Sequence, residues 1–231
     1  MCTSEYKGLN ILQSIFHFFD VLTGSFDLFL NGLLLTVELT FVSLVVALVI
    51  GLFFSLLKIS NSKILEWIAD IYIWAVRGTP LIVQIFILYY GLTAFVELSA
   101  FTAGTAALAF HNGAYIAEIF RGSIQSIDNG QSEAGNSLGM SRMLTMRRII
   151  LPQAFRRAVP PLGNQFIIAL KDSSLISFIG MQELFGVANT QGSNNFDFLT
   201  FYVVVAIYYL FVVLILTLIV NRIEKKMSTG D

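Results

Sequence analysis

Residues 198–220 read "FLTFYVVVAIYYLFVVLILTLIV" and carry no charged side chain. A helix rises 1.5 Å per residue, so about 20 apolar residues cross the roughly 30 Å hydrocarbon core of a bilayer. In lipid every backbone polar group needs a partner inside the protein, and a helix meets this condition by itself. The stretch therefore predicts a membrane-spanning helix.

The composition of the whole chain is that of a membrane protein. Of its 231 residues, 56% are hydrophobic and 13% are charged, against about 45–50% and about 25% in soluble domains. The net charge of −1 supplies no basic face for a phosphate backbone, so no nucleic acid is expected as a partner. A single cysteine, Cys2, excludes an internal disulfide and a cysteine-based metal cage. We expect an all-α, multi-pass membrane protein without a metal site.

Two apolar segments in the first half of the chain are long enough to span. Residues 30–57 carry one charge, Glu38, and residues 65–95 are interrupted by the sequence "RGTP" at 77–80. The second segment is too long for one untilted crossing. Either its helix kinks near Gly78 and Pro80, or the crossing begins near Thr79 after an interfacial helix.

Two further spans are expected at about 101–120 and about 160–180. The former is rich in small residues, and the latter opens with Pro160 and Pro161, a pair suited to a helix start. The total is then about five spans. Residues 1–26 before them are expected to form an amphipathic or interfacial segment, or else a simple extension of the first span.

The basic residues predict the orientation, because Lys and Arg accumulate in cytoplasmic loops. Eleven of the fourteen basic residues fall between the first and second spans, between the third and fourth, or after the fifth. This places the N-terminus outside and the C-terminus, with a tail at 227–231, in the cytoplasm. It also predicts a long cytoplasmic loop at about 121–158.

The loop carries signals for two short helices. Asp128 with Gln131 resembles a capping box, and Ser132 is an alternative N-cap, before the helical run "EAGNSL". Gly139 can end this run in a left-handed conformation, Ser141 can cap the next run, "RMLTMRRII", and Pro152 is expected to stop it. Small residues, methionines and arginines together are typical of a docking surface.

Ser137 lies in a G-x-S-x-G pattern, which in hydrolases marks a nucleophile. That motif needs a strand before it, and an Asp and then a His later in the chain. The only histidines, His17 and His111, precede Ser137, and no strand pattern precedes it either. We therefore expect no catalytic residue, and the chain is not expected to be an enzyme.

The stretch "EAGNSLGMSRMLTMRRIILP" at 133–152 resembles the EAA loop of the membrane-spanning subunits of ATP-binding-cassette (ABC) importers. The spacing matches throughout, and the one departure is Gly135, where the family usually has Ala. The sequences "RGTPLIVQIF", "AYIAEIFRGSIQSID", "PQAFRRAVPPLGNQFI" and "KDSSLISFIG" narrow the resemblance to the polar amino acid uptake branch, the His/Glu/Gln/Arg permeases. The resemblance covers about residues 27–226 and implies the type I ABC importer fold.

The resemblance implies a division of labour in a bacterial cytoplasmic membrane. This permease would work with a second permease subunit, the same or homologous, and with an extracytoplasmic binding protein that delivers the amino acid. A cytoplasmic ATPase dimer would bind ATP and Mg²⁺, and this chain indeed has no G-x-x-x-x-G-K-[ST] phosphate loop and needs no cofactor of its own. The residues expected to couple to the ATPase lie in the EAA loop: Glu133, Ala134, Gly135, Gly139, Met143 and Arg147.

Ionisable residues inside a bilayer usually mark a transport path or a paired contact. Arg77 and Glu118 have the charges that a zwitterionic amino acid needs, but an ion pair between spans, or snorkelling to the interface, is the favoured interpretation. Lone His111 is more typical of packing than of metal binding. The candidates for a substrate path are Arg77, Gln84, His111, Asn112, Glu118, Lys171 and Ser173.

A different class of function is left open. An ion-coupled secondary carrier or a channel would use the loop only as a connector and would need no ATPase partner. Such carriers often contain internal repeats and broken half-helices. The chain has no convincing internal repeat, which favours the importer subunit.

Overall fold

The computed structural model describes residues 11–228, and these residues contain helices but no strand. Most of the helices are α-helical, with π-helical turns at η1 and η2 and a 3₁₀ turn at η3. Their bounds are α1 (Ile11–Gly24), α2 (Phe26–Lys58), α3 (Lys63–Arg77), α4 (Leu81–Phe86), η1 (Ile87–Gly91), α5 (Ala100–Gln125), α6 (Asn129–Ser137), α7 (Arg142–Thr145), η2 (Met146–Ile150), α8 (Leu151–Asp172), η3 (Ser173–Ile179), α9 (Leu184–Asn195) and α10 (Phe198–Ser228).

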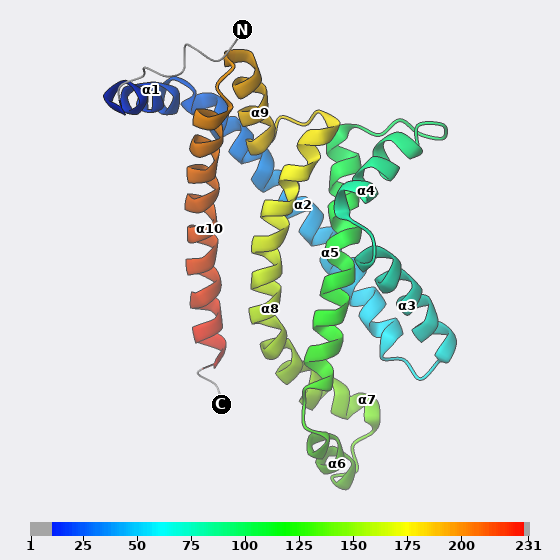
Figure 1. The fold of residues 1–231 in the computed structure, drawn as a ribbon. Helices are drawn as coiled ribbons and strands as arrows, with labels where there is room; N and C mark the ends of the chain where they lie inside the picture. Colours follow the sequence, from blue (N-terminus) through cyan, green and yellow to red (C-terminus); the bar gives the residue numbers. More distant parts are fainter. Residues whose placement is uncertain (1–10, 229–231) are drawn as a thin grey trace.

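Long helices run between two ends of the molecule (Figure 1). α5, α8 and α10 lie roughly along one direction and α2 crosses behind them obliquely, while α6 and α7 form the lower end and α1 and α9 the upper end. α2 and α5 make the most extensive contact between any two elements. Glycines permit this close approach: a Cβ on Gly51 or Gly113 would lie less than 3.0 Å from Ile116 or Ile50 of the facing helix. Small residues serve in this way between membrane helices.

Not all of the helices have the length and apolar composition of a membrane span. By length and composition alone, α2 and α10 can each cross a membrane, and α3 with α4 and η1 can form a third, broken span with a bend of 102°. That break falls at Gly78–Pro80, as the sequence predicts, and its angle corresponds to two separate helices rather than to a kink. α5 and α8 are less apolar because they carry polar side chains into the interior, so the count of five spans stays a prediction.

The predictions for three prolines are wrong. Pro152 does not stop the second loop helix, since η2 runs directly into α8 at Leu151. Pro152 follows directly on the wider π-helical turn of η2, so the helix continues through the position where proline has no N–H to donate. Pro160 and Pro161 lie inside α8 rather than at a helix start, and α8 changes direction in its lower part (Figure 1). Membrane helices tolerate interior prolines where neighbouring groups satisfy the freed carbonyls.

α1 lies across the upper end of the molecule, and the chain changes direction between it and α2 (Figure 1). It is therefore not a straight extension of the first span. Phe16 and Phe19 are exposed, and the His17 Nε2 atom lies 2.8 Å from a carboxylate oxygen of Asp197 before α10. Its location in the membrane interface stays a prediction, and Cys2 lies outside the described residues.

Buried Glu183 organises the upper end. Its carboxylate caps α9 by accepting the backbone N–H of Phe185 at 2.9 Å and of Gly186 at 2.7 Å. The hydroxyl of Tyr209 on α10 donates to it at 3.2 Å. One side chain thus joins α9 to the last helix.

Candidate functional sites: the coupling loop and the charged pocket

The loop expected to couple to an ATPase is called the coupling loop here and consists of residues 126–150. It is shorter than the predicted 121–158, because α5 runs to Gln125 and α8 begins at Leu151. It starts with a capped helix. The Asp128 side chain accepts the backbone N–H of Gly130 at 2.6 Å, so Asp128, and not Ser132, is the N-cap of α6. Ser141 caps α7 by accepting the N–H of Leu144 at 3.4 Å, as the sequence predicts. Both helix starts are therefore satisfied within a few residues of chain.

Gly139 ends α6 in the left-handed conformation that the sequence predicts, with φ of +76°. The Met140 N–H donates to the carbonyl of Gly135 at 3.0 Å, and the Gly139 N–H donates to that of Asn136 at 2.9 Å. This pair of bonds is the Schellman motif, which satisfies the last carbonyls of a helix. It turns the chain sharply from α6 into α7.

Gly135 is the point where the two loop helices touch. A Cβ at this position would lie 2.7 Å from both Cγ2 and Oγ1 of buried Thr145. The departure from the Ala that is usual in the resembling family therefore permits a closer contact between α6 and α7 in this chain. Behind this contact Ile127, Ile150 and Ala154 form a small buried cluster that anchors the loop to α8.

The outer side of the loop is exposed and chemically mixed. Glu133, Ala134, Met143 and Arg147 are all exposed, as is Leu138, whose side chain is 80% accessible. The outer side of the loop thus carries exposed apolar and charged side chains together. The hydroxyl of Ser137 donates to the carbonyl of Glu133 at 2.9 Å, so it closes a turn of its own helix.

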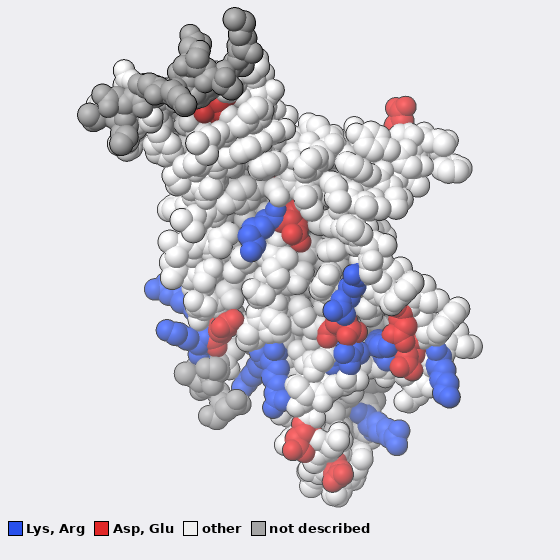
Figure 2. Space-filling model, in the orientation of Figure 1, with Lys and Arg blue, Asp and Glu red and all other residues white. Residues whose placement is uncertain are grey.

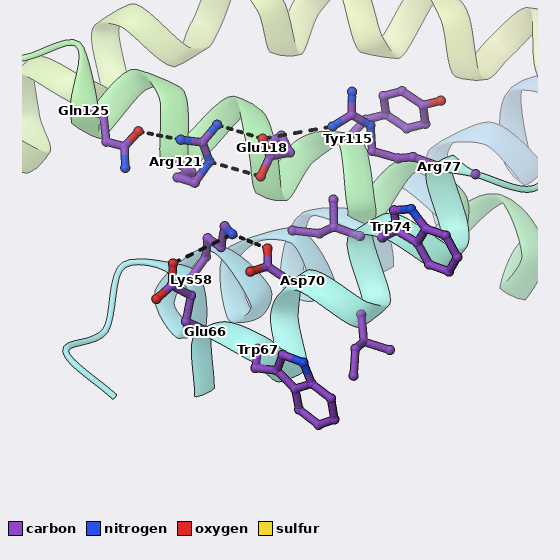
Figure 3. Close-up of a pocket in the computed structure, with 13 residues that line it drawn as sticks. Lys58, Glu66, Trp67, Asp70, Trp74, Arg77, Tyr115, Glu118, Arg121 and Gln125 are labelled. Atoms are coloured by element: carbon purple, nitrogen blue, oxygen red, sulfur yellow. Dashed lines mark hydrogen bonds and ion pairs between the residues drawn. The ribbon is translucent and has the colours of Figure 1, made fainter. Parts of the chain in front are cut away.

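The charged pocket is a cavity of about 920 Å³ between α3 and α5 (Figure 3). Glu118 accepts two bonds from Arg121, at 3.0 and 2.7 Å, and lies 4.0 Å from an Arg77 nitrogen. The guanidinium of Arg77 lies 5.1 Å from the ring centre of Tyr115, in cation–π contact. The structure thus brings Arg77 and Glu118 together in the interhelical ion pair that the sequence analysis favoured.

The opposite wall of the pocket is also charged. Lys58, at the end of α2, pairs with Asp70 and lies 4.0 Å from Glu66. Trp67 and Trp74 of α3 stand at its edge (Figure 3). Both signs of charge therefore line one cavity, at the lower half of the molecule where Figure 2 shows most Lys, Arg, Asp and Glu side chains.

Other candidates for the substrate path form interior hydrogen bonds. Gln84 bonds to Nδ1 of His111 at 3.2 Å and donates to the carbonyl of Val76 at 2.7 Å, which ties α4 to α5 and α3. Asn112 is fully buried and accepts the side-chain amide of Gln165 at 2.8 Å, which ties α5 to α8. The Gln84 bonds span the break at Gly78–Pro80, and the bond between Gln165 and Asn112 lies in the packed interior.

The last two candidates are neighbours in sequence but differ in environment. Ser173 is fully buried, and its hydroxyl donates to the carbonyl of Leu170 at 2.7 Å. Lys171, at the end of α8, is exposed beside Asp172, which is half-buried. Neither belongs to the charged pocket, so the seven candidates do not form one site.

Sequence reasoning missed Lys58, Asp70, Arg121 and Gln165. The spacing of Glu118 and Arg121, three residues apart on one helix, is a signal that could have found Arg121. Lys58 and Asp70 lie twelve residues apart across a turn, and Gln165 lies 53 residues from Asn112. No local pattern indicates those partners.

Comparisons with known proteins agree with the geometry. The chain matches the family model of the binding-protein-dependent transport system inner membrane component over residues 26–229. It is 40% identical over 200 residues to the L-cystine transport system permease protein TcyB of Bacillus subtilis, covering 86% of each chain. It is also 40% identical over 204 residues to the glutamine transport system permease protein GlnP of Escherichia coli, covering 87% of this chain and 93% of that protein.

Two solved structures share the fold. An amino acid ABC transporter crystallised with histidines has 39% identity and a TM-score of 0.85, with 88% of this chain and 96% of that chain covered. The inward-facing MetNI methionine ABC transporter has 20% identity and a TM-score of 0.76, over 88% of this chain and 98% of that chain, and supports the fold alone. The chain therefore belongs to the family of inner membrane components of binding-protein-dependent transport systems, as a permease subunit of a bacterial ABC transporter.

Proposed function

We propose that this permease imports a polar amino acid and that a separate ATPase drives it through the coupling loop. The observation that carries the proposal is the construction of the loop. Its two short helices are locked together by the Gly135–Thr145 contact and the Gly139 turn. A rigid loop can transmit the movement of a bound ATPase to the long helices, whereas a flexible connector would deform instead.

The outer side of the loop supports docking of an ATPase subunit. Leu138 and Met143 offer apolar surface for burial, and Glu133 and Arg147 offer charges that orient a partner. These residues belong to the segment from α6 to η2, and α6 and α7 form the lower end of the molecule (Figure 1). ATP and Mg²⁺ would be bound by that partner, since this sequence has no phosphate loop.

A second permease subunit, identical or homologous, would complete the pathway. The most apolar part of α10 is only 11% buried within the chain, so most of its surface is left for lipid or another subunit. Lys171 is exposed at the upper end of α8. A charged side chain of this kind faces a water-filled cavity or a partner more readily than lipid.

The charged pocket suits a zwitterionic cargo. A carboxylate can pair with Arg77 or Arg121, and an ammonium can pair with Glu118 or Asp70. The contact between Arg77 and Glu118 is long, at 4.0 Å, and partly exposed, so its exchange for a contact with a ligand costs little. The relatives transport cystine and glutamine by name, and both are polar amino acids with a zwitterionic backbone.

Reconstitution tests the proposal. The permease, its ATPase and an amino acid-binding protein are placed in proteoliposomes, with glutamine, cystine, arginine and histidine as labelled cargo. Uptake is expected to require ATP on the side of the coupling loop and the binding protein on the other side. Uptake driven by an ion gradient without the ATPase would instead identify an ion-coupled carrier.

A further inference from the structure

A second cavity lies between the start of α8 and the end of α10, away from the charged pocket. Its volume is about 440 Å³, within the range of small-ligand sites. Among the described residues, three cations (Arg156, Arg157 and Lys225) and one carboxylate (Glu224) line it. Figure 2 shows Lys and Arg side chains gathered at the lower ends of these helices. We call this cavity the basic groove.

The local backbone presents these arginines. Pro160 lines the basic groove, and with Pro161 it lies inside α8 four residues after Arg156 and Arg157. The guanidinium of Arg157 donates to the hydroxyl of Ser126 at 3.1 Å and to the Ser126 carbonyl. Because Ser126 lies between α5 and α6, this bond places the groove at the level where the long helices give way to the coupling loop.

Exposed apolar side chains lie near the groove-lining residues in the sequence of both helices. Phe155 of α8 is exposed one residue before Arg156, and α10 exposes an apolar row that leads up from Lys225. That row consists of Leu214, Ile215, Leu218, Ile219 and Ile223. A cationic cavity beneath an exposed apolar surface matches a molecule with an anionic head and hydrocarbon chains.

We propose that the basic groove binds the phosphate headgroup of an anionic phospholipid in the cytoplasmic leaflet, with its acyl chains along α10. Guanidinium groups bind phosphate oxygens through paired hydrogen bonds. Basic pockets between membrane helices on the cytoplasmic side suit anionic headgroups. A free phosphate would satisfy the charge but would leave the apolar row uncovered. This proposal does not depend on which cargo the permease carries.

Lipid titration of the full-length permease by native mass spectrometry tests the proposal. The probes are dioctanoyl phosphatidylglycerol, dioctanoyl phosphatidylcholine and inorganic phosphate. Arg156→Gln and Lys225→Gln are each expected to weaken phosphatidylglycerol binding about fivefold, the effect of one cation near an anionic headgroup. Lys63→Gln, a basic residue exposed on α3, is the matched control and is expected to change nothing.

Glu224→Gln supplies a test of opposite sign, which a poorly folded variant could not imitate. Removing the Glu224 carboxylate, the negative charge among the described lining residues, is expected to tighten phosphatidylglycerol binding several-fold. Equal binding of phosphatidylglycerol and phosphatidylcholine would overturn the proposal, as would unchanged binding in the Arg156 and Lys225 variants. Inorganic phosphate that binds as tightly as the lipid would identify an ion site instead.

Discussion

The coupling loop and the polar interior are both polar regions of an apolar chain, yet different contacts hold them. In the loop, Asp128, Gly139 and Ser141 bond to groups within five residues of themselves. In the interior, Gln84 bonds to His111 and Asn112 bonds to Gln165, across 27 and 53 residues. Local chain geometry sets the helix ends of the loop, whereas the fold as a whole sets the hydrogen bonds of the interior.

Because of this difference, the side chains that stabilise the fold are not the side chains that the loop exposes. The loop turns its charged and apolar side chains outward, where they contribute little to the fold of this chain. The interior side chains satisfy one another, so they contribute to stability. Changes on the outer side of the loop should therefore affect coupling, and changes in the interior should affect unfolding.

The largest effect on stability is expected from Asn112→Leu. It leaves the buried amide of Gln165 without its partner, and we expect a loss of up to about 3 kcal/mol in the free energy of unfolding. Combining it with Gln165→Met removes both polar groups and should recover most of this loss. SDS titration measures the free energy of unfolding of Asn112→Leu, of Gln165→Met and of the double variant. A double variant that loses the sum of both single effects would contradict the pairing.

Gly135→Ala is expected to cost about 2 kcal/mol in the loop, through overpacking against Thr145. Hydrogen exchange of the α6 amides measures this local stability. Thr145→Ala removes both atoms in the 2.7 Å contact, so Gly135→Ala with Thr145→Ala should exchange like the original chain. Fast exchange in that double variant would show that another contact locks the loop.

The helix ends of the loop could be predicted from the sequence, but the contacts of Gly135 with Thr145 and of Asn112 with Gln165 could not. The helix caps and the left-handed glycine depend on a few adjacent residues, and they were predicted from them. The contact of Gly135 with Thr145, like the bond of Asn112 with Gln165, depends on how helices pack, and no local pattern encodes it. Pro160 was misassigned for the same reason, since its tolerance inside α8 depends on the surrounding membrane fold.

Gly139→Ala is expected to cost about 1 kcal/mol, the strain of a left-handed backbone with a Cβ. Gly122→Ala is the matched control. Neither Cβ would meet another atom within 4 Å, and only Gly139 has a positive φ. The control should be neutral or slightly stabilising, because alanine favours a helix. Equal effects in both variants, measured by hydrogen exchange around each site, would argue against the strained turn.

Arg77→Gln is expected to change the free energy of unfolding least, by less than about 1 kcal/mol. Its contact with Glu118 is long, at 4.0 Å, and its side chain is 43% exposed. If the charged pocket binds the cargo, the same variant should raise the KM for uptake. An unchanged KM together with a large loss of stability would make Arg77 a structural residue instead.

The central claim, that the loop couples this permease to an ATPase, is tested most directly at Glu133. The measurement is cargo-stimulated ATP hydrolysis by the reconstituted complex, with assembly checked by copurification of the ATPase. Glu133→Lys is expected to lower stimulated hydrolysis by at least about tenfold in an intact permease, because it reverses an exposed charge on the proposed docking surface. If Glu133 has no role beyond its own helix, stimulated hydrolysis would stay near the original rate, and the account would be contradicted.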